Sequence, residues 1–138
     1  MNVIEEIKAK LQKYPHAQYE ADGNSIRVLP TSDDGFTVSL ITNRNTYTVS
    51  FDGWHEDFHD KEEALNCFVF GLSTGCRLKE FRRGRFTYKW IVEAKESGRW
   101  VEYSETGLLV FPFWMKETVR YLQNDLISGE REEAKPDI

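Results

Sequence analysis

HDKEEALNCFVFGLSTG, residues 59–75, is the stretch that decides the fold, because it predicts a helix at the centre of the domain. Asp60 and Glu63 have the spacing of a capping box, so the helix should begin at Asp60. Gly75 suits a left-handed helix end. A helix that is apolar nearly all round is typically buried. The apolar residues of this one are Ala64, Leu65, Cys67, Phe68, Val69, Phe70 and Leu72.

Residues 55–59 read His-Glu-Asp-Phe-His and match the H-E-x-x-H pattern of zinc hydrolases. In those enzymes both histidines lie one turn apart on a helix, so that their rings reach one Zn²⁺ while the glutamate polarises its water. A helix that begins at Asp60 leaves this pattern outside, and the turn signal at residues 52–53 predicts a loop or a single irregular turn for residues 55–58. His16 is the only other histidine. A zinc-dependent hydrolase is therefore the less favoured function, with candidate residues His55, Glu56 and His59.

The sequence before the central helix predicts one helix and four strands. Residues 3–14 carry apolar residues at helical spacing, and Tyr14-Pro15 should end this amphipathic helix. From residue 18 to residue 52 the apolar period changes to two. Short turns at residues 22–23, 31–35 and 43–45 divide this stretch into four strands, which predicts an antiparallel meander.

The sequence after the central helix predicts three or four further strands and a third helix. The strands are expected at residues 76–83, 85–94, 99–104 and 108–111. Pro112 suits the first turn of a helix, and the spacing of the apolar residues that follow extends this helix to about Leu126. Residues 128–138 are acidic and almost free of apolar side chains, so they are expected to form a flexible tail.

The predicted fold class is α+β, with antiparallel sheet(s) of seven to eight strands in the order α-ββββ-α-βββ(β)-α and helices packed on one face. This element order is similar to that of the small dimeric secretion chaperones, which use helices and a curved sheet to hold a partner segment. The resemblance covers the chain in outline only. It implies a homodimeric, chaperone-like binding protein, and it transfers no residue roles.

Size and composition predict a single domain over residues 1–127. The chain has 138 residues, of which 40% are hydrophobic, enough for a core. No apolar run approaches the roughly 20 residues that cross a bilayer, and no signal peptide is apparent, so we expect a cytoplasmic protein. Cys67 and Cys76 fit neither a disulfide framework nor a CxxC pair and are expected to be buried thiols. No cofactor is predicted.

Six basic residues lie close together in the second half of the chain, and aromatic residues alternate with them. They are Arg77, Lys79, Arg82, Arg83, Arg85 and Lys89. Basic strands with exposed aromatics bind single-stranded nucleic acid in several proteins, so a nucleic-acid binder using residues 77–89 is an alternative function. The net charge of −5 opposes it, because phosphate contacts dominate such affinity. An anionic protein partner is favoured instead.

Residues 111–114 place four apolar residues, Phe-Pro-Phe-Trp, at a predicted strand-to-helix junction. Any of them left exposed, with Tyr121 further along, would form an aromatic contact for a partner or a second copy. Nucleophile-elbow, phosphate-loop and dinucleotide motifs are absent, which disfavours an enzyme. The sequence therefore favours a non-enzymatic binding or adaptor domain for a protein partner or for self-association. Its candidate binding residues are Arg77, Lys79, Arg82, Arg83, Arg85, Trp114 and Tyr121.

Overall fold

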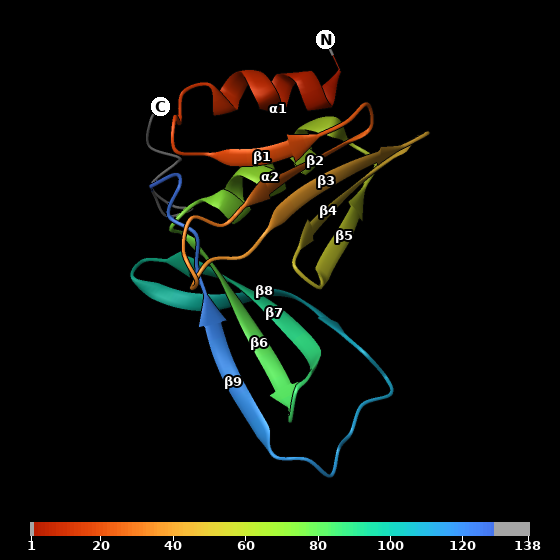
Figure 1. The fold of residues 1–138 in the computed structure, drawn as a ribbon, viewed down its shortest axis with the longest axis vertical. Helices are drawn as coiled ribbons and strands as arrows, with labels where there is room; N and C mark the ends of the chain where they lie inside the picture. Colours follow the sequence, from red (N-terminus) through yellow and green to blue (C-terminus); the bar gives the residue numbers. More distant parts are fainter. Residues whose placement is uncertain (1, 129–138) are drawn as a thin grey trace.

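The computed structural model describes residues 2–128, which form two helices and nine strands (Figure 1). The helices are α1 (Val3–Leu11) and α2 (Lys61–Leu72). The strands are β1 (Gln18–Ala21), β2 (Ser25–Leu29), β3 (Val38–Asn43), β4 (Thr46–Phe51), β5 (Trp54–Phe58), β6 (Cys76–Arg83), β7 (Phe86–Glu96), β8 (Arg99–Gly107) and β9 (Glu117–Leu122). Apart from Ser128, the predicted tail lies outside the described residues.

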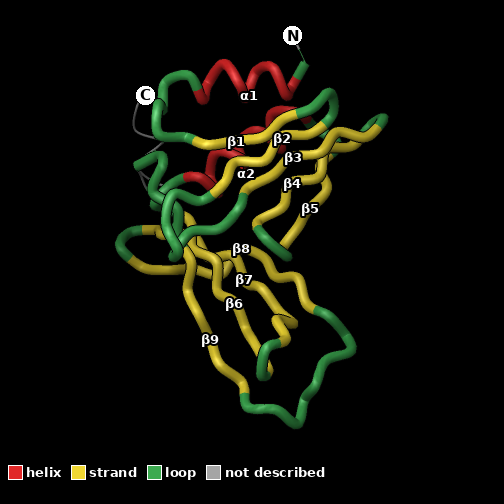
Figure 2. The backbone as a smooth tube through the Cα atoms, viewed as in Figure 1, coloured by secondary structure: helices red, strands yellow, loops and turns green. Residues whose placement is uncertain are grey.

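The strands form two separate antiparallel sheets. The first has the order β1-β2-β3-β4-β5, which is a meander with each strand beside the next. The second has the order β8-β7-β6-β9, so the last strand returns to pair with β6. In Figure 2 the first sheet lies beside the helices, and the second extends away from them to a long loop between β8 and β9.

The predicted fold class is wrong, because the described chain is mostly antiparallel β, with two helices and two sheets of five and four strands. The helix predicted from Pro112 to Leu126 is instead a loop followed by β9, and residues 108–111 form no strand. Residues 55–58, predicted to be a loop or a single irregular turn, instead belong to β5 with Trp54. The element order thus differs from the one on which the likeness to secretion chaperones was based.

The local sequence explains why β9 is a strand. Thr118, Val119 and Tyr121 are β-branched or aromatic and favour a pleated strand, although the wider apolar spacing fits a helix. The edge of β6 opposite β7 would otherwise expose a row of unpaired N–H and C=O groups. β9 occupies that edge, from Arg83 opposite Glu117 to Leu78 opposite Leu122. Long-range pairing therefore overrides the helical period.

Helix α2 begins where the sequence predicted. The Asp60 carboxylate accepts a hydrogen bond from the Glu63 N–H at 2.9 Å, which satisfies one of the free donors of the first turn. The helix ends at Ser73, whose backbone is extended, and Gly75 does not take the predicted left-handed conformation. The buried face of α2 packs on β3, β4 and β5 of the first sheet.

One main core joins the first sheet, both helices and the nearer part of the second sheet. Its fully buried members include Leu40, Phe51 and Phe68, together with Leu78 and Leu122 of the second sheet. Cys67 and Cys76 are buried and free, as predicted. Burial raises the pKa of the Cys67 thiol to about 12, so this group is inert as a thiolate nucleophile.

The two sheets meet at the turn between β4 and β5. Trp54 is fully buried there, and its Nε1–H donates to Ser104 Oγ of β8 at 3.2 Å. Gly53 lies directly on the ring of Trp90, where any Cβ would overlap the indole. Burial raises the pKa of Asp52 in the same turn, and its carboxylate accepts the Thr37 N–H at 3.0 Å.

Replacing Gly71 in α2 by alanine should destabilise the protein by about 1–2 kcal/mol. Alanine favours a helix by about 1 kcal/mol over glycine, but a Cβ here would overlap the fully buried Phe51 ring, and overpacking costs about 1–3 kcal/mol. Urea unfolding measures the difference. Gly23→Ala, which meets no atom within 4 Å, is the matched control. A Gly71→Ala variant that is more stable than the parent would show that the contact with Phe51 is not tight.

Candidate functional site

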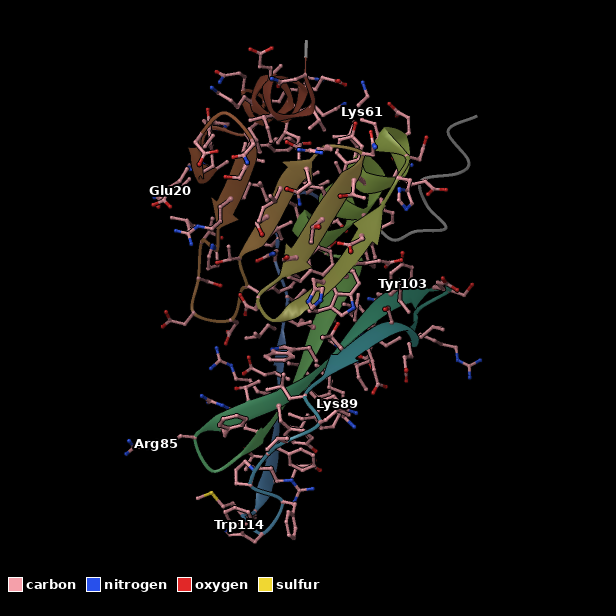
Figure 3. The ribbon with its side chains drawn as sticks, turned by 90° about the vertical axis from the view of Figure 1, so that its right-hand side faces the viewer. Glu20, Lys61, Arg85, Lys89, Tyr103 and Trp114 are labelled. Carbon is pink, nitrogen blue, oxygen red and sulfur yellow. The ribbon has the colours of Figure 1, made fainter. Side chains whose placement is uncertain are left out.

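The most exposed apolar residues of the described chain lie in the connection from β8 to β9. We call residues Leu108–Met115 the apolar loop, because none of its eight residues is charged. It lies at the end of the second sheet furthest from α1 (Figure 1), and Figure 3 shows Trp114 at that extremity. The loop therefore lies at one end of the molecule.

Four large side chains of the apolar loop are almost fully exposed. The exposed fractions are 97% for Leu109, 84% for Val110, 70% for Phe113 and 73% for Trp114. At roughly 200 Å² for each large side chain, they present on the order of 600 Å² of apolar surface. Patches of this size lie at the upper end of what monomers expose and often serve as interaction sites.

The apolar loop is anchored to the sheet by one aromatic side chain. The ring of Phe111 stacks on Tyr88 with centroids 4.2 Å apart and planes at 17°. Tyr88 belongs to a small core on the second sheet with Phe81 and Ile91, separate from the main core. Phe111 thus ties the middle of the loop down while its neighbours remain exposed.

Arg83 provides a second anchor, through the loop backbone. Its guanidinium donates to the carbonyl oxygens of Phe113 at 3.4 Å and Met115 at 3.2 Å. It also lies 3.5 Å from the Glu117 carboxylate, which accepts a hydrogen bond from the Tyr88 hydroxyl. That hydrogen bond raises the pKa of the Tyr88 hydroxyl above its usual value. The loop is therefore held at its middle by Phe111 and at its C-terminal part by Arg83.

Other predicted binding residues on this face are engaged within the protein. The Arg77 guanidinium lies between the rings of Trp100 and Tyr121, at 4.3 and 4.2 Å from their centroids. It also pairs with Glu93 at 2.5 Å. The Lys79 ammonium lies over Tyr121, 5.8 Å from the ring centroid, and also contacts the Phe81 ring. These cation–π contacts join β8, β6 and β9 across the sheet, so Arg77 and Tyr121 stabilise it.

Arg82 and Arg85 lie nearer the apolar loop. Arg85 is exposed in the turn between β6 and β7 and points away from the protein (Figure 3). Arg82 is half-buried, and its Nε has no hydrogen-bond partner among the described residues. The side chain of Met115 packs against Gly84 in the same turn, where a positive φ of 63° favours glycine. This contact places the basic turn next to the loop.

The predicted site residues are thus only partly brought together. Arg83 bonds to the loop backbone on both sides of Trp114, and Arg85 lies nearby. Arg77, Lys79 and Tyr121 form a separate group further along the sheet. Sequence reasoning missed Leu109 and Val110, because it expected a strand there. The signal that could have found them is the uncharged run of eight residues between Gly107 and Lys116, which is longer than a single edge strand needs.

The H-E-x-x-H residues do not have the zinc-hydrolase arrangement. His55 lies in β5 and His59 in the bend after it, so four residue steps of extended chain, about 13 Å, separate them, whereas one helical turn is about 5.4 Å. Their Nδ1 atoms lie near different carbonyl oxygens, at 3.5 Å from Gly53 and 3.3 Å from Asn45. Over residues 2–128, no group of three or more His, Cys, Asp or Glu side chains is arranged to hold a metal ion.

The apolar loop, its two anchors and the neighbouring basic turn are therefore the candidate site. None of the helices among residues 2–128 has the length and apolar character needed to span a bilayer. Comparisons with protein-family models, with curated proteins and with solved structures gave no match.

Proposed function

We propose that the chain is a non-enzymatic protein-binding domain that contacts its partner through the apolar loop. The observation that supports this most directly is the exposure of Leu109, Val110, Phe113 and Trp114, each at 70% or more. Leaving four such side chains in water is unfavourable, since each would gain roughly 1.5–3 kcal/mol on burial. Burial of these side chains against a partner surface would release this free energy and so favour binding.

The anchoring of the loop supports a binding role. A loop that becomes ordered only on binding loses conformational entropy, which weakens the affinity. Phe111 and Arg83 already fix this loop in the free protein, so binding avoids that cost. Tryptophan is among the residues that contribute most at protein interfaces, especially within a well-packed centre. Trp114 packs edge-on against Phe113, with ring centroids 5.3 Å apart, and together they form a preformed aromatic contact.

The charges around the loop define the chemistry of the partner. Arg85 and Lys116 are both exposed beside the Met115 end of the loop, where Gly84 contacts Met115 and bonds to Lys116, while the whole chain carries a net charge of −5. Exposed basic side chains thus lie at this end of the loop, although the chain as a whole is acidic. The complementary surface is an apolar hollow with an acidic rim, because such a rim steers association and opposes wrong partners. A cytoplasmic location and the domain boundaries 1–127 stay predictions from the sequence.

Placing a photo-cross-linking amino acid at position 114 should give protein adducts in cells that produce the chain. The reason is that this side chain is exposed at the centre of the proposed contact. Adducts are detected by gel mobility and mass spectrometry. The matched control is position 20, because Glu20 is also exposed but lies on the first sheet, far from the loop (Figure 3). Adducts at neither 109 nor 114, or adducts of equal yield at 20, would contradict the proposal.

The double variant Phe113→Ser/Trp114→Ser should abolish the adducts formed from position 109. The free energy of unfolding of the monomer should change by less than about 0.5 kcal/mol, because both side chains are exposed in the single chain and contribute little to its folding. Urea unfolding and the cross-linking yield are measured on the same protein. Undiminished adducts in a folded double variant would show that these aromatics are not the contact.

A further inference from the structure

Strand β9 has an unpaired edge beside the apolar loop. It is the outer strand of the second sheet and pairs only with β6 among the described strands. All five residues from Glu117 to Tyr121 are exposed, including Val119 at 43% and Tyr121 at 46%. An exposed edge strand with large apolar side chains is a template for pairing with another strand.

The hydrogen bonds at the two ends of β9 show which of its residues face outward. The Gly84 N–H donates to the Lys116 carbonyl oxygen at 3.4 Å, so the backbone at 116 points toward β6. The Gln123 N–H donates at 2.7 Å to the Asp34 carbonyl oxygen on the opposite side. Because these directions alternate along a strand, the backbone groups of Glu117, Val119 and Tyr121 point outward.

The available edge has defined limits. At its upper end the loop that contains Asp33 and Asp34 covers the strand, because Arg120 donates to the Asp33 carbonyl oxygen at 3.0 Å and Gln123 to that of Asp34. At its lower end the strand begins at Glu117, immediately after the apolar loop. The three outward-facing residues, Glu117, Val119 and Tyr121, lie between these limits. This segment is centred on Val119.

We propose that the partner of the apolar loop is a second copy of the chain, bound by antiparallel pairing of β9 with β9 about Val119. Val119 then lies opposite Val119 of the second copy, and Glu117 lies opposite Tyr121 of the second copy. The pairing satisfies the free backbone groups of all three outward-facing residues. It joins the two four-stranded sheets into one sheet across a twofold axis.

Charge and area both favour this pairing. It brings the exposed Lys116 of each copy close to the end of the β9 edge of the other copy, where Asp33 and Asp34 are exposed. A standard interface buries about 800 Å² per partner, and the apolar loop, which directly precedes β9, presents on the order of 600 Å² of apolar surface. The other edge of this sheet, β8, exposes Glu102 and Glu105, which would repel their counterparts in a self-pairing.

This inference rests on the proposed function, since it names the protein that covers the loop. Light scattering of the purified full chain at micromolar concentration should give twice the chain mass of 16.2 kDa. Val119→Pro should give a folded monomer, because the outward N–H that proline removes is not bonded to β6. Circular dichroism confirms the fold of the variant. A monomeric parent, or a Val119→Pro variant that stays dimeric, would overturn the inference.

A cysteine at the proposed twofold axis tests the register. Residues directly opposite in a hydrogen-bonded antiparallel pair have Cα atoms about 5.5 Å apart, which fits a disulfide. Val119→Cys should therefore form an intermolecular disulfide under mild oxidation. Val101→Cys on β8 is the matched control, since Val101 and Val119 are 44% and 43% exposed, and it should remain reduced. Cross-linking of Val101→Cys in equal yield, or none for Val119→Cys in a dimer, would contradict the register.

The two hypotheses fail in different ways. If the chain is a monomer but still forms adducts with another protein from position 114, the proposed binding function is supported and the β9 dimer is excluded. If Val119→Cys cross-links the dimer but positions 109 and 114 give no adduct, the β9 dimer is supported and the apolar loop is excluded as the contact. Adducts between two copies from position 114 are expected if both hypotheses hold.

Discussion

Replacing Trp54 by alanine should lower the free energy of unfolding by about 4 kcal/mol, because removing a fully buried tryptophan leaves a large cavity. The Trp54 ring lies 4.6 Å from that of Phe51 within the first sheet and 6.4 Å from that of Tyr103 in the second. Its Nε1–H also donates to Ser104 across the junction. The substitution therefore weakens both the core and the contact between the sheets.

Chemical unfolding followed by circular dichroism measures this effect without relying on tryptophan fluorescence. Trp114→Ala is the matched control, because the same side chain is removed from a position that is 73% exposed. Its expected change is within about 0.5 kcal/mol. Similar losses for both variants would mean that Trp54 does not join the sheets, or that the apolar loop is packed against the protein.

The local elements of this fold could be predicted from short sequence patterns. The start of α2 depends on one side chain, Asp60, and the four strands of the meander depend on alternation and turn residues near them in sequence. β5 was missed because residues 55–58 were interpreted as a loop or a single irregular turn that follows the turn at residues 52–53. Its strand conformation depends on pairing with β4, in which Phe51 lies opposite Trp54.

The third predicted helix failed for a related reason. The apolar spacing from Phe111 to Leu126 is compatible with a helix, and the edge of β6 that selects the strand lies about forty residues earlier in the sequence. The same limit applies to the candidate site. A sequence can show that Trp114 and Arg83 are present, but only the packing of Phe111 on Tyr88 leaves the other loop side chains exposed.

Replacing Asn124 by alanine should lower the free energy of unfolding by about 3 kcal/mol, although the residue lies in an irregular segment after β9. Asn124 is 7% exposed, and its Oδ1 accepts the Phe36 N–H at 3.0 Å. Its Nδ2–H donates at 2.9 Å to the Gly71 carbonyl oxygen in the last turn of α2. Alanine would leave both backbone groups buried without partners, and each such group costs about 1–3 kcal/mol.

Two measurements separate this effect from general loosening of the C-terminal segment. The neighbouring Gln123→Ala removes one exposed hydrogen bond, from its Nε2–H to the Thr74 carbonyl oxygen, and should cost less than about 1 kcal/mol in urea unfolding. Hydrogen exchange should be faster at the Phe36 amide in Asn124→Ala by more than the global loss of stability explains, because its acceptor is gone. If the Phe36 amide keeps the same protection relative to the rest of the core, water has replaced the Asn124 side-chain amide as its partner. The loss of free energy of unfolding in Asn124→Ala should then be close to that in Gln123→Ala.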